Sequence, residues 1–393
     1  MRNIPGLLLL AGLVALSVGC RSQAPVANKT DAAGPFKFIN FDLAGQPVEV
    51  ISFDDAIALY PEQQAAFAEY MASDQADTLA PHKRTADYIE EIVQHFEYRD
   101  QTVAPALALQ QGGGNCMSLA MLTTSLANQA GVEVRYRLIE QMPVFSMSGS
   151  IGLTSVHVRT ILIENQQRTN QNGFSFSSSR VAIDFFPSAS DRRGRAISHQ
   201  EFESLYYRNL AVESLIDSDL DLAFQYAVQS LAAAPDNPES INLMATLHQR
   251  LGDDDTAERL FQHGIAHAPE TLNLLDNYQY LLARQGRMRE RKKLIEQIHR
   301  LDHSSPFGWY RLALSAAQQE NNELAIRYYK RALEYAPDLK VAWLGLANAY
   351  TELGSAYRAN EALQQALDIA QSDQRRTAQL DLKCLKQTAK HCH

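Results

Sequence analysis

The chain has 393 residues, which is long enough for two or three domains. Its hydrophobic fraction of 46% and charged fraction of 21% are typical of an ordinary globular protein. The formal net charge is −9, and no long basic stripe offsets it. Because an acidic chain repels the phosphate backbone, the composition argues against nucleic-acid binding.

Residues 1–20 have the pattern of an export signal. Arg2 supplies a positive charge, and the apolar run at 4–18 is shorter than the roughly 20 residues of a membrane-spanning helix. The run ends in LSVGC, which resembles the bacterial lipobox except that Ser17 stands where the motif usually has Leu. The resemblance implies cleavage before Cys20 and lipidation of this residue. An ordinary cleaved signal with a chance cysteine is the alternative.

Residue 21 is Arg rather than Asp. By resemblance to the sorting rule of bacterial lipoproteins, this implies the outer membrane, with the protein facing the periplasm. Residues 21–35 have no apolar period and are rich in Ala, Pro, Asn and Gly. We interpret them as a flexible tether between a lipid anchor and the first folded domain.

Residues 36–200 combine helical and strand patterns. Apolar residues have helical spacing at 53–59, 61–72 and 85–98, and another helix runs from Cys116 to a stop at Gly131. Strand-like runs follow at 132–139, 155–164 and 181–186, with polar loops at 146–152 and 165–179. This order of elements, with the helices first and the strands after them, predicts an α+β domain with an antiparallel sheet.

A candidate nucleophile, Cys116, opens the apolar helix after a glycine-rich loop, within QGGGNCMSLA at 111–120. A helix N-terminus carries partial positive charge and unpaired N–H groups, which stabilise a thiolate and can hold an oxyanion. A nucleophilic cysteine also needs a base and a group that orients the base. His157 in the second strand run is the candidate base, and Asp184 in the third is the orienting group. An inert core cysteine is the alternative.

The chain order Cys116, His157, Asp184 on helix, strand and strand resembles the transglutaminase-like superfamily, which has a papain-like fold. The resemblance covers about residues 80–190 and includes FEYRD at 96–100, GNCMSLA at 114–120 and AGVEVR at 130–135. It implies that the Cys attacks an amide or ester carbonyl, the His passes protons and the Asp steers the His. The resemblance does not identify which side chain would donate a hydrogen bond to the oxyanion. The candidates are Gln110, Gln111 and Asn115. The loop at 142–154 is long enough to lie over such a site.

A 34-residue period runs through the second half of the chain, as between Trp309 and Trp343. Five units align without a gap, at 204–237, 238–271, 272–305, 306–339 and 340–373. Small residues recur at position 8 and position 20, except in the third unit, which has Gln279 and Arg291 there. Prolines close three units, at Pro235, Pro269 and Pro337.

The period and its landmarks resemble the tetratricopeptide repeat, in which each helical hairpin buries its apolar face against its neighbours. The resemblance implies an all-α solenoid whose concave groove binds a peptide or a protein. A purely structural solenoid packed on the neighbouring domain is the alternative. A basic run between Arg284 and Lys293 is interpreted as a solvated helix face rather than an anion site.

Residues 374–393 form a C-terminal tail that contains Cys384 and Cys392. These two cysteines can form a disulfide with each other, which would leave Cys116 as the unpaired thiol. The tail ends in Lys390-His391-Cys392-His393, whose spacing fits no structural zinc pattern. We therefore expect no metal site and no cofactor.

These patterns predict a papain/transglutaminase-like α+β domain followed by an all-α solenoid of tetratricopeptide repeats. The favoured function is that of a membrane-anchored periplasmic thiol hydrolase or acyltransferase acting on a peptide or protein amide. The repeats would then bind the substrate or a partner. The alternative is a catalytically silent scaffold or assembly lipoprotein that uses the α+β domain only for binding.

Overall fold

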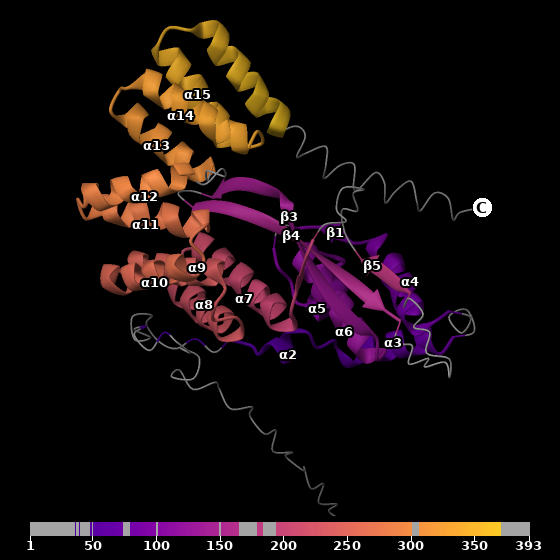
Figure 1. Cartoon of the computed structure of the whole chain (residues 1–393). Helices are drawn as coiled ribbons and strands as arrows, with labels where there is room; N and C mark the ends of the chain where they lie inside the picture. Colours follow the sequence, from indigo (N-terminus) through magenta and orange to yellow (C-terminus); the bar gives the residue numbers. More distant parts are fainter. Residues whose placement is uncertain are drawn as a thin grey trace, which may run out of the picture.

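The computed structural model describes residues 36, 39, 48, 50–73, 79–99, 101–148, 151–164, 179–183, 194–300 and 306–370 (Figure 1). For residues 98, 140–148, 151–156, 299 and 300 only the backbone is considered. The expected signal with Cys20, the tether at 21–35, Asp184, and the tail with Cys384 and Cys392 lie outside the described residues. Within the described part, no helix is long and apolar enough to span a bilayer.

The first part of the chain is mainly helical. It contains α2 (Phe53–Ala56), α3 (Pro61–Met71), α4 (Pro81–Val93), α5 (Pro105–Gln111) and α6 (Cys116–Gln129). Three of these helices begin with proline, whose fixed φ suits the first helical turn and whose missing N–H would have no partner there. The two-residue strands β1 (Glu97–Tyr98) and β2 (Gly113–Gly114) pair in parallel just before α6.

A four-stranded antiparallel sheet follows, in which three strands lie at the predicted runs and the fourth, at 195–197, was not predicted. It consists of β3 (Glu133–Ser148), β4 (Ile151–Ile163), β5 (Arg180–Ile183) and β6 (Arg195–Ile197), in the order β5-β4-β3-β6. The expected loops at 146–152 and 142–154 are wrong, because β3 and β4 remain paired as far as Ser148 and Ile151. Backbone hydrogen bonds hold the Ser- and Gly-rich sequence in strands there, whatever its turn propensity.

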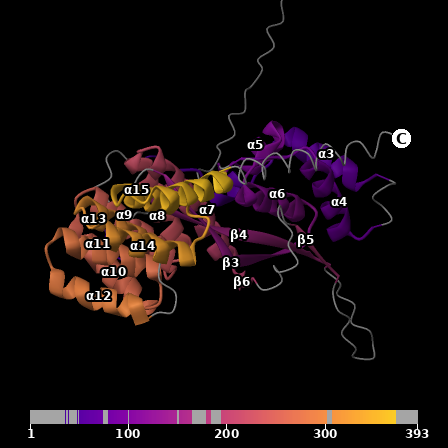
Figure 2. The same ribbon diagram turned by 90° about the horizontal axis from the view of Figure 1, so that it is seen from above.

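Helix α6 packs against one face of this sheet, and Figure 2 shows the early helices gathered on that side. Met117 and Met121 of the helix share a buried cluster with Leu138 and Val158 of the strands. The Tyr136 hydroxyl lies 3.0 Å from Thr124 Oγ1 of α6, and burial raises the pKa of Tyr136 to about 12. In β3 up to Ile139 and in β4 from His157 onward, the even-numbered residues therefore face α6, and strand alternation directs the odd-numbered ones to the other face.

The second part is an array of helical hairpins, of which four begin at the residue predicted for their unit, whereas the first begins at His199 rather than at 204. The pairs are α7 (His199–Ile216) with α8 (Leu220–Ala233), α9 (Pro238–Arg250) with α10 (Asp254–His267), α11 (Leu272–Arg284) with α12 (Met288–Arg300), α13 (Pro306–Gln318) with α14 (Asn322–Tyr335), and α15 (Lys340–Glu352) with the helix at 356–370. The small residues expected at position 20 are buried in four units, at Ala223, Ala257, Ala325 and Ala359. The period thus identified the repeated structure correctly.

The third unit departs from the pattern at two positions that interact. Arg291 Nε donates a hydrogen bond of 2.9 Å to Gln279 Oε1, so a polar pair joins α12 to α11 where small residues join the other hairpins. Two other arginines of the basic run bind neighbouring acids, with Arg284 3.1 Å from Asp254 and Arg287 2.6 Å from Glu258. These ion pairs link the third repeat to the second.

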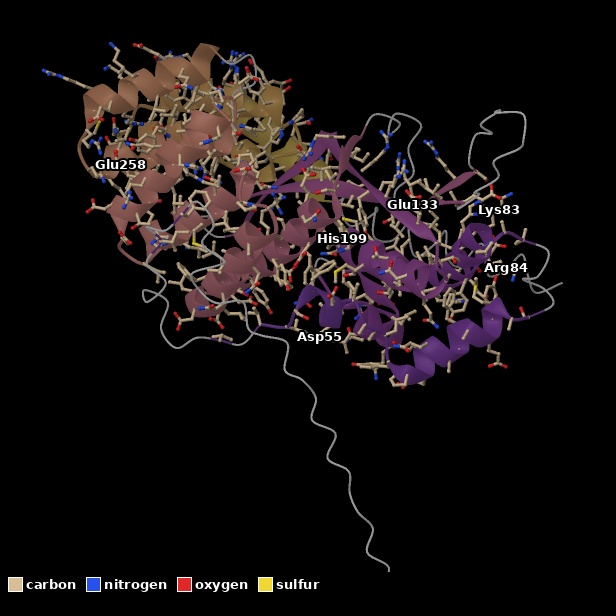
Figure 3. The ribbon with its side chains drawn as sticks, turned by 60° about the horizontal axis from the view of Figure 1, so that its bottom comes forward. Asp55, Lys83, Arg84, Glu133, His199 and Glu258 are labelled. Carbon is tan, nitrogen blue, oxygen red and sulfur yellow. The ribbon has the colours of Figure 1, made fainter. Side chains whose placement is uncertain are left out.

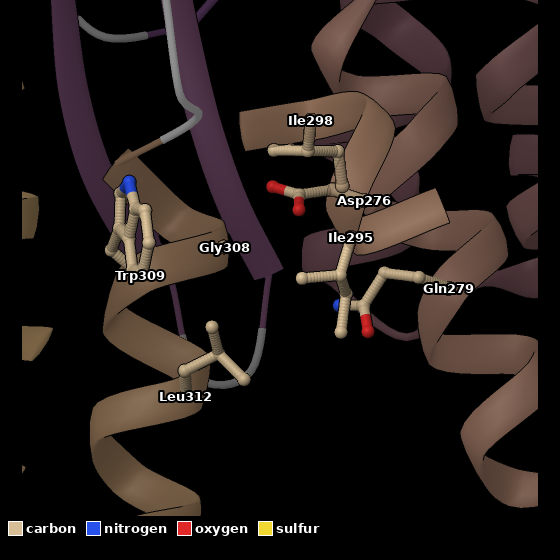
Figure 4. Close-up of a pocket in the computed structure, with 7 residues that line it drawn as sticks. All are labelled: Asp276, Gln279, Ile295, Ile298, Gly308, Trp309 and Leu312. Carbon is tan, nitrogen blue, oxygen red and sulfur yellow. The ribbon is translucent and has the colours of Figure 1, made fainter. Parts of the chain in front are cut away.

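The apolar core of the array is divided between the third and fourth repeats. One buried cluster ends at Ile298, and the next begins at Phe307. At this joint the Arg311 guanidinium lies 3.5 Å from the buried Asp276 carboxylate. Gly308 packs so tightly on Asp276 that a Cβ there would lie 2.4 Å from the carboxylate oxygen (Figure 4). A charged contact therefore replaces the continuous apolar core at the joint.

Helix α7 belongs to both parts of the molecule. Its Phe202 ring stacks on Tyr136 of the sheet, with centroids 4.0 Å apart, and its Tyr206 and Tyr207 pack around Phe53 of α2. The opposite side of α7 begins the core of the array, through Ala211 and Leu215. Figure 3 shows His199, the first residue of α7, at the boundary between the two parts. The predicted boundary near residue 200 therefore does not separate two independent cores.

Histidines removed from water make the fold sensitive to acid. Burial lowers the pKa of His82, His248 and His263, although Asp253 at 3.1 Å partly opposes this effect at His248. The unfolded chain therefore binds more protons than the folded chain once the pH falls below about 6.5. The histidine contribution to stability is complete above that pH and is lost as the pH falls through the lowered folded-state pKa values.

We expect the free energy of unfolding, measured by urea denaturation, to fall more steeply between pH 7 and pH 5 in the wild type than in His248→Gln. The difference in slope should be at most about 1.4 kcal/mol per pH unit, since one proton is involved. Equal slopes for the two proteins would contradict this assignment.

Candidate functional site

Cys116 lies at the first turn of α6 as a free, half-buried thiol. Asn115 caps the helix, because its Oδ1 accepts a hydrogen bond of 3.0 Å from Ser118 N. Gly112 adopts a left-handed conformation at the end of α5, and a Cβ on Gly114 would lie 2.5 Å from Ser118 Cβ. The glycines before Cys116 thus serve a sharp turn and a close approach to the helix.

The cap of α6 is connected to the repeat array by hydrogen bonds. Asn115 Nδ2 donates to Thr102 Oγ1 over 2.9 Å, and Thr102 N donates to Glu213 Oε1 of α7 over 2.9 Å. Burial raises the pKa of Glu213, while its hydrogen bonds from Thr102 act in the opposite direction. The position of the Cys116 turn therefore depends on the first repeat.

The three candidate oxyanion donors lie near the turn in different settings. Both polar groups of the Asn115 side chain are used by the cap and by Thr102. Gln111 is exposed, and its Oε1 accepts a hydrogen bond of 3.3 Å from Arg99 Nη1. Gln110 is an exposed residue of α5. Asn115 is thus occupied by a structural role, whereas the two glutamines lie on the surface.

His157 lies on β4, where it pairs with Ile139 of β3. Its neighbour Val158 is buried against Met117 at the start of α6. Strand alternation therefore directs His157 to the opposite face of the sheet, the face that also carries Arg137 and Arg159. This register favours a position of His157 away from α6, and the contact expected between His157 and Cys116 stays a prediction. The third expected member, Asp184, follows the last described residue of β5 and lies outside the described residues.

Sequence reasoning could not choose the face of the sheet on which His157 lies. Both possible faces carry apolar residues along this strand, since Val158 and Leu162 alternate with Ile161 and Ile163. Such a strand has no simple apolar-in, polar-out alternation to fix its orientation. In the part of the chain that the structure describes, no cluster of three His, Cys, Asp or Glu side chains has a metal-binding arrangement.

A second candidate site lies on the inner side of the repeat array. The first helices of successive repeats contact each other, as α7 does with α9, α9 with α11 and α13 with α15. In a curved array of hairpins, the row of helices that approach each other most closely forms the concave side. The concave side of this array is therefore lined by α7, α9, α11, α13 and α15.

Polar side chains join neighbouring helices along this row. Asn273 Nδ2 lies 3.0 Å from Glu239 Oε2, and Asn277 Nδ2 donates to Asn242 Oδ1 over 2.8 Å. Desolvation lowers the pKa of Arg208 in the same row, and the Glu239 carboxylate partly opposes this effect. The Asp276–Arg311 contact continues the series across the joint, and Figure 4 shows the Asp276 carboxylate directed toward α13. We call this series the polar ladder.

Three large apolar side chains are exposed beside the ladder. They are Tyr280 on α11, Leu314 on α13 and Leu344 on α15, with exposed fractions of 48%, 37% and 40%. Tyr280 is one helical turn beyond Asp276, and Leu314 is one turn beyond Arg311, so these residues share a face. We call the three side chains the apolar triplet. Exposed apolar groups flanked by fixed polar groups are typical of protein-binding surfaces.

Comparison with known proteins identifies the repeats. Two sequence profiles, both described as tetratricopeptide repeat, match residues 306–339 and 341–373. No curated protein matches the chain as a relative. Residues 306–339 and 341–373 therefore match the tetratricopeptide repeat, and the hairpins before them share the same 34-residue period.

Solved structures resemble less than half of the chain. TTC0263, a thermophilic TPR protein of Thermus thermophilus, has 20% identity and a TM-score of 0.36, covering 46% of this chain and 99% of that one. MamA has 15% identity and a TM-score of 0.31, covering 42% and 97%. The APC/C hetero-tetramer Cut9-Hcn1 has 17% identity and a TM-score of 0.35, covering 47% and 37%.

Proposed function

We propose that this protein is a scaffold that binds another protein on the concave side of its repeat array. The observation that carries the proposal is the apolar triplet beside the polar ladder. The ladder holds its polar groups in fixed positions, so a partner does not have to order them on binding. The triplet supplies exposed apolar area, which is the main source of binding free energy.

The contacts of α7 support this function. Since α7 joins the core of the sheet to the core of the array, the α+β part holds the first repeat in a fixed orientation. The hydrogen bond from Thr102 to Glu213 strengthens the same connection. A partner bound by the array would thus be held at a defined position relative to the α+β part, as an assembly factor requires.

A photoreactive amino acid tests the proposed surface. With p-benzoylphenylalanine in place of Tyr280, we expect a discrete cross-linked protein in cells, because position 280 faces the partner. Met288 is more exposed but lies on α12, in the outer row, so the same replacement there is the matched control. Leu314→Asp should reduce the cross-link at 280 at least fivefold, since a central apolar contact commonly contributes more than about 1 kcal/mol. Equal yields from positions 280 and 288 would exclude this surface.

We further propose that the scaffold is a lipoprotein of the outer membrane that faces the periplasm. The proposal rests on the charged N-terminal region, the short apolar run and the sequence LSVGC at 16–20. A single acyl chain gives only weak membrane binding, so stable attachment requires the multiple acylation of a lipoprotein cysteine.

Metabolic labelling with an alkyne fatty acid checks this anchor. The wild-type chain should incorporate the label and sediment with membranes, whereas Cys20→Ala should lose the label and at least nine-tenths of the membrane-bound fraction. Cys384→Ala is the control and should keep both. Label that persists in Cys20→Ala would rule out this site of lipidation.

A second candidate function is acyl transfer or hydrolysis at Cys116, on a peptide or protein amide. The observation that favours it is a free, half-buried thiol at the first turn of a 14-residue helix. This function also requires His157 to reach the thiol and Asp184 to orient His157. We rank the scaffold first, because strand alternation from the buried Val158 favours the face away from α6 for His157.

Alkylation rates separate the two functions. Iodoacetamide modification of Cys116, followed by peptide mass spectrometry at pH 6 and pH 8, should change less than twofold in His157→Ala, because the imidazole lies on the other face of the sheet. His95→Ala, at an exposed position outside the sheet, is the matched control. A tenfold or larger loss of rate in His157→Ala alone would instead establish the thiol function.

A further inference from the structure

The hairpin of β3 and β4 continues beyond the sheet as a two-stranded arm. Strand β6 pairs only with Tyr136–Leu138, and β5 pairs only with Thr160–Ile163. The pairing of β3 with β4 shifts between Ile139 and Val144, and then continues from Val144 and Ser155 to Ser148 and Ile151. We call residues 144–148 and 151–155 the arm, since no strand of the described residues pairs with either of its outer edges.

The arm extends along the concave side of the repeat array. Strand β3 contacts α7, the first helix of the first repeat, and also α15, the first helix of the fifth repeat. Both helices belong to the inner row. Strand β3 therefore reaches both ends of the inner row, although its pairing with β4 shifts between Ile139 and Val144. Figure 1 shows β3 and β4 extending from the sheet toward α13 and α15.

An isolated two-stranded hairpin is at best marginally stable in water, so the arm requires a supporting surface. Its sequence is rich in apolar residues, with Val144, Phe145, Met147, Ile151 and Leu153. The inner row offers the apolar triplet on α11, α13 and α15. The two helices of the inner row that β3 contacts, α7 and α15, lie on opposite sides of the joint between the two apolar clusters.

We propose that the arm is an intramolecular occupant of the concave surface and competes there with the protein partner. The inference rests on the proposed scaffold function and adds a regulatory step to it. A tethered segment has an effective concentration in the millimolar range, so an arm contact with an intrinsic Kd of about 0.1 mM keeps the surface closed for most of the time. If the closed state is tenfold more populated than the open one, the partner's apparent Kd rises about tenfold.

The register of the hairpin allows the arm to be removed without disturbing the sheet. Ile139 and His157 are the last regular pair before the shift. Replacing residues 140–156 with Asn-Gly joins this pair through a two-residue turn of the type that suits a β-hairpin. Circular dichroism and the unfolding midpoint of this arm-less full chain establish that the repeats remain folded.

The probe is a fluorescent peptide of residues 143–156, closed by a disulfide between added terminal cysteines. We expect the arm-less chain to bind it saturably and the wild-type chain to bind it at least tenfold more weakly, because the wild-type surface already holds its own arm. In the arm-less chain, Leu314→Asp should weaken binding at least fivefold, whereas Met288→Asp on the outer row should leave it unchanged. Equal affinity of the two chains, or no saturable binding by the folded arm-less chain, would overturn the proposal.

The photo-cross-link at position 280 separates this inference from the scaffold function. If the arm peptide binds as expected but no protein is cross-linked in either the wild-type or the arm-less chain, the scaffold function fails and the arm contact stands. If the cross-link forms with equal yield in both chains, the scaffold function stands and competition by the arm fails. A higher yield in the arm-less chain supports both.

Discussion

The burial of α7 on two sides is the constraint on which the rest of the structure depends. The Phe202 ring stacks on Tyr136 of the sheet, while Ala211 and Leu215 begin the core of the array. A helix that is covered on both sides cannot rotate without exposing one of the two apolar surfaces to water. The direction in which the array grows away from the α+β part is therefore determined by the packing of one helix.

This constraint also determines where the arm lies. The arm is an extension of β3, and β3 contributes Tyr136 to the contact with α7. The strand that positions the first repeat is thus the same strand that reaches α15. The Glu213–Thr102–Asn115 hydrogen bonds act at the other end of α7, where they connect the array to the turn that carries Cys116. A movement of the repeats would therefore displace both the arm and the turn that carries Cys116.

The repeats were predictable from sequence because their information is local and repeated. Each hairpin must bury the same small and large positions, so five aligned units specify the helices almost to the residue, as Pro238 and Pro306 at helix starts illustrate. The antiparallel sheet was also predicted. The contact between Cys116 and His157 was not predictable in the same way, since a shift of one residue in strand orientation exchanges the two faces of a sheet. The length of the hairpin was missed because Ser and Gly residues in 146–152 suggested a loop, although pairing to the opposite strand extends through them.

The third repeat departs from the repeat pattern at two positions, and the residues at these positions contact each other. Gln279 and Arg291 replace the small residues that bring the two helices of a hairpin together, and they are joined by a hydrogen bond instead. Directly after this hairpin the apolar core stops, and the Asp276–Arg311 contact takes its place. Because the Asp276 carboxylate is buried, separating it from Arg311 would weaken the compensation of a buried charge, which is costly. The third and fourth repeats are therefore joined by a contact between two charges that stabilise each other, at the place where the buried apolar cluster of the first three repeats ends.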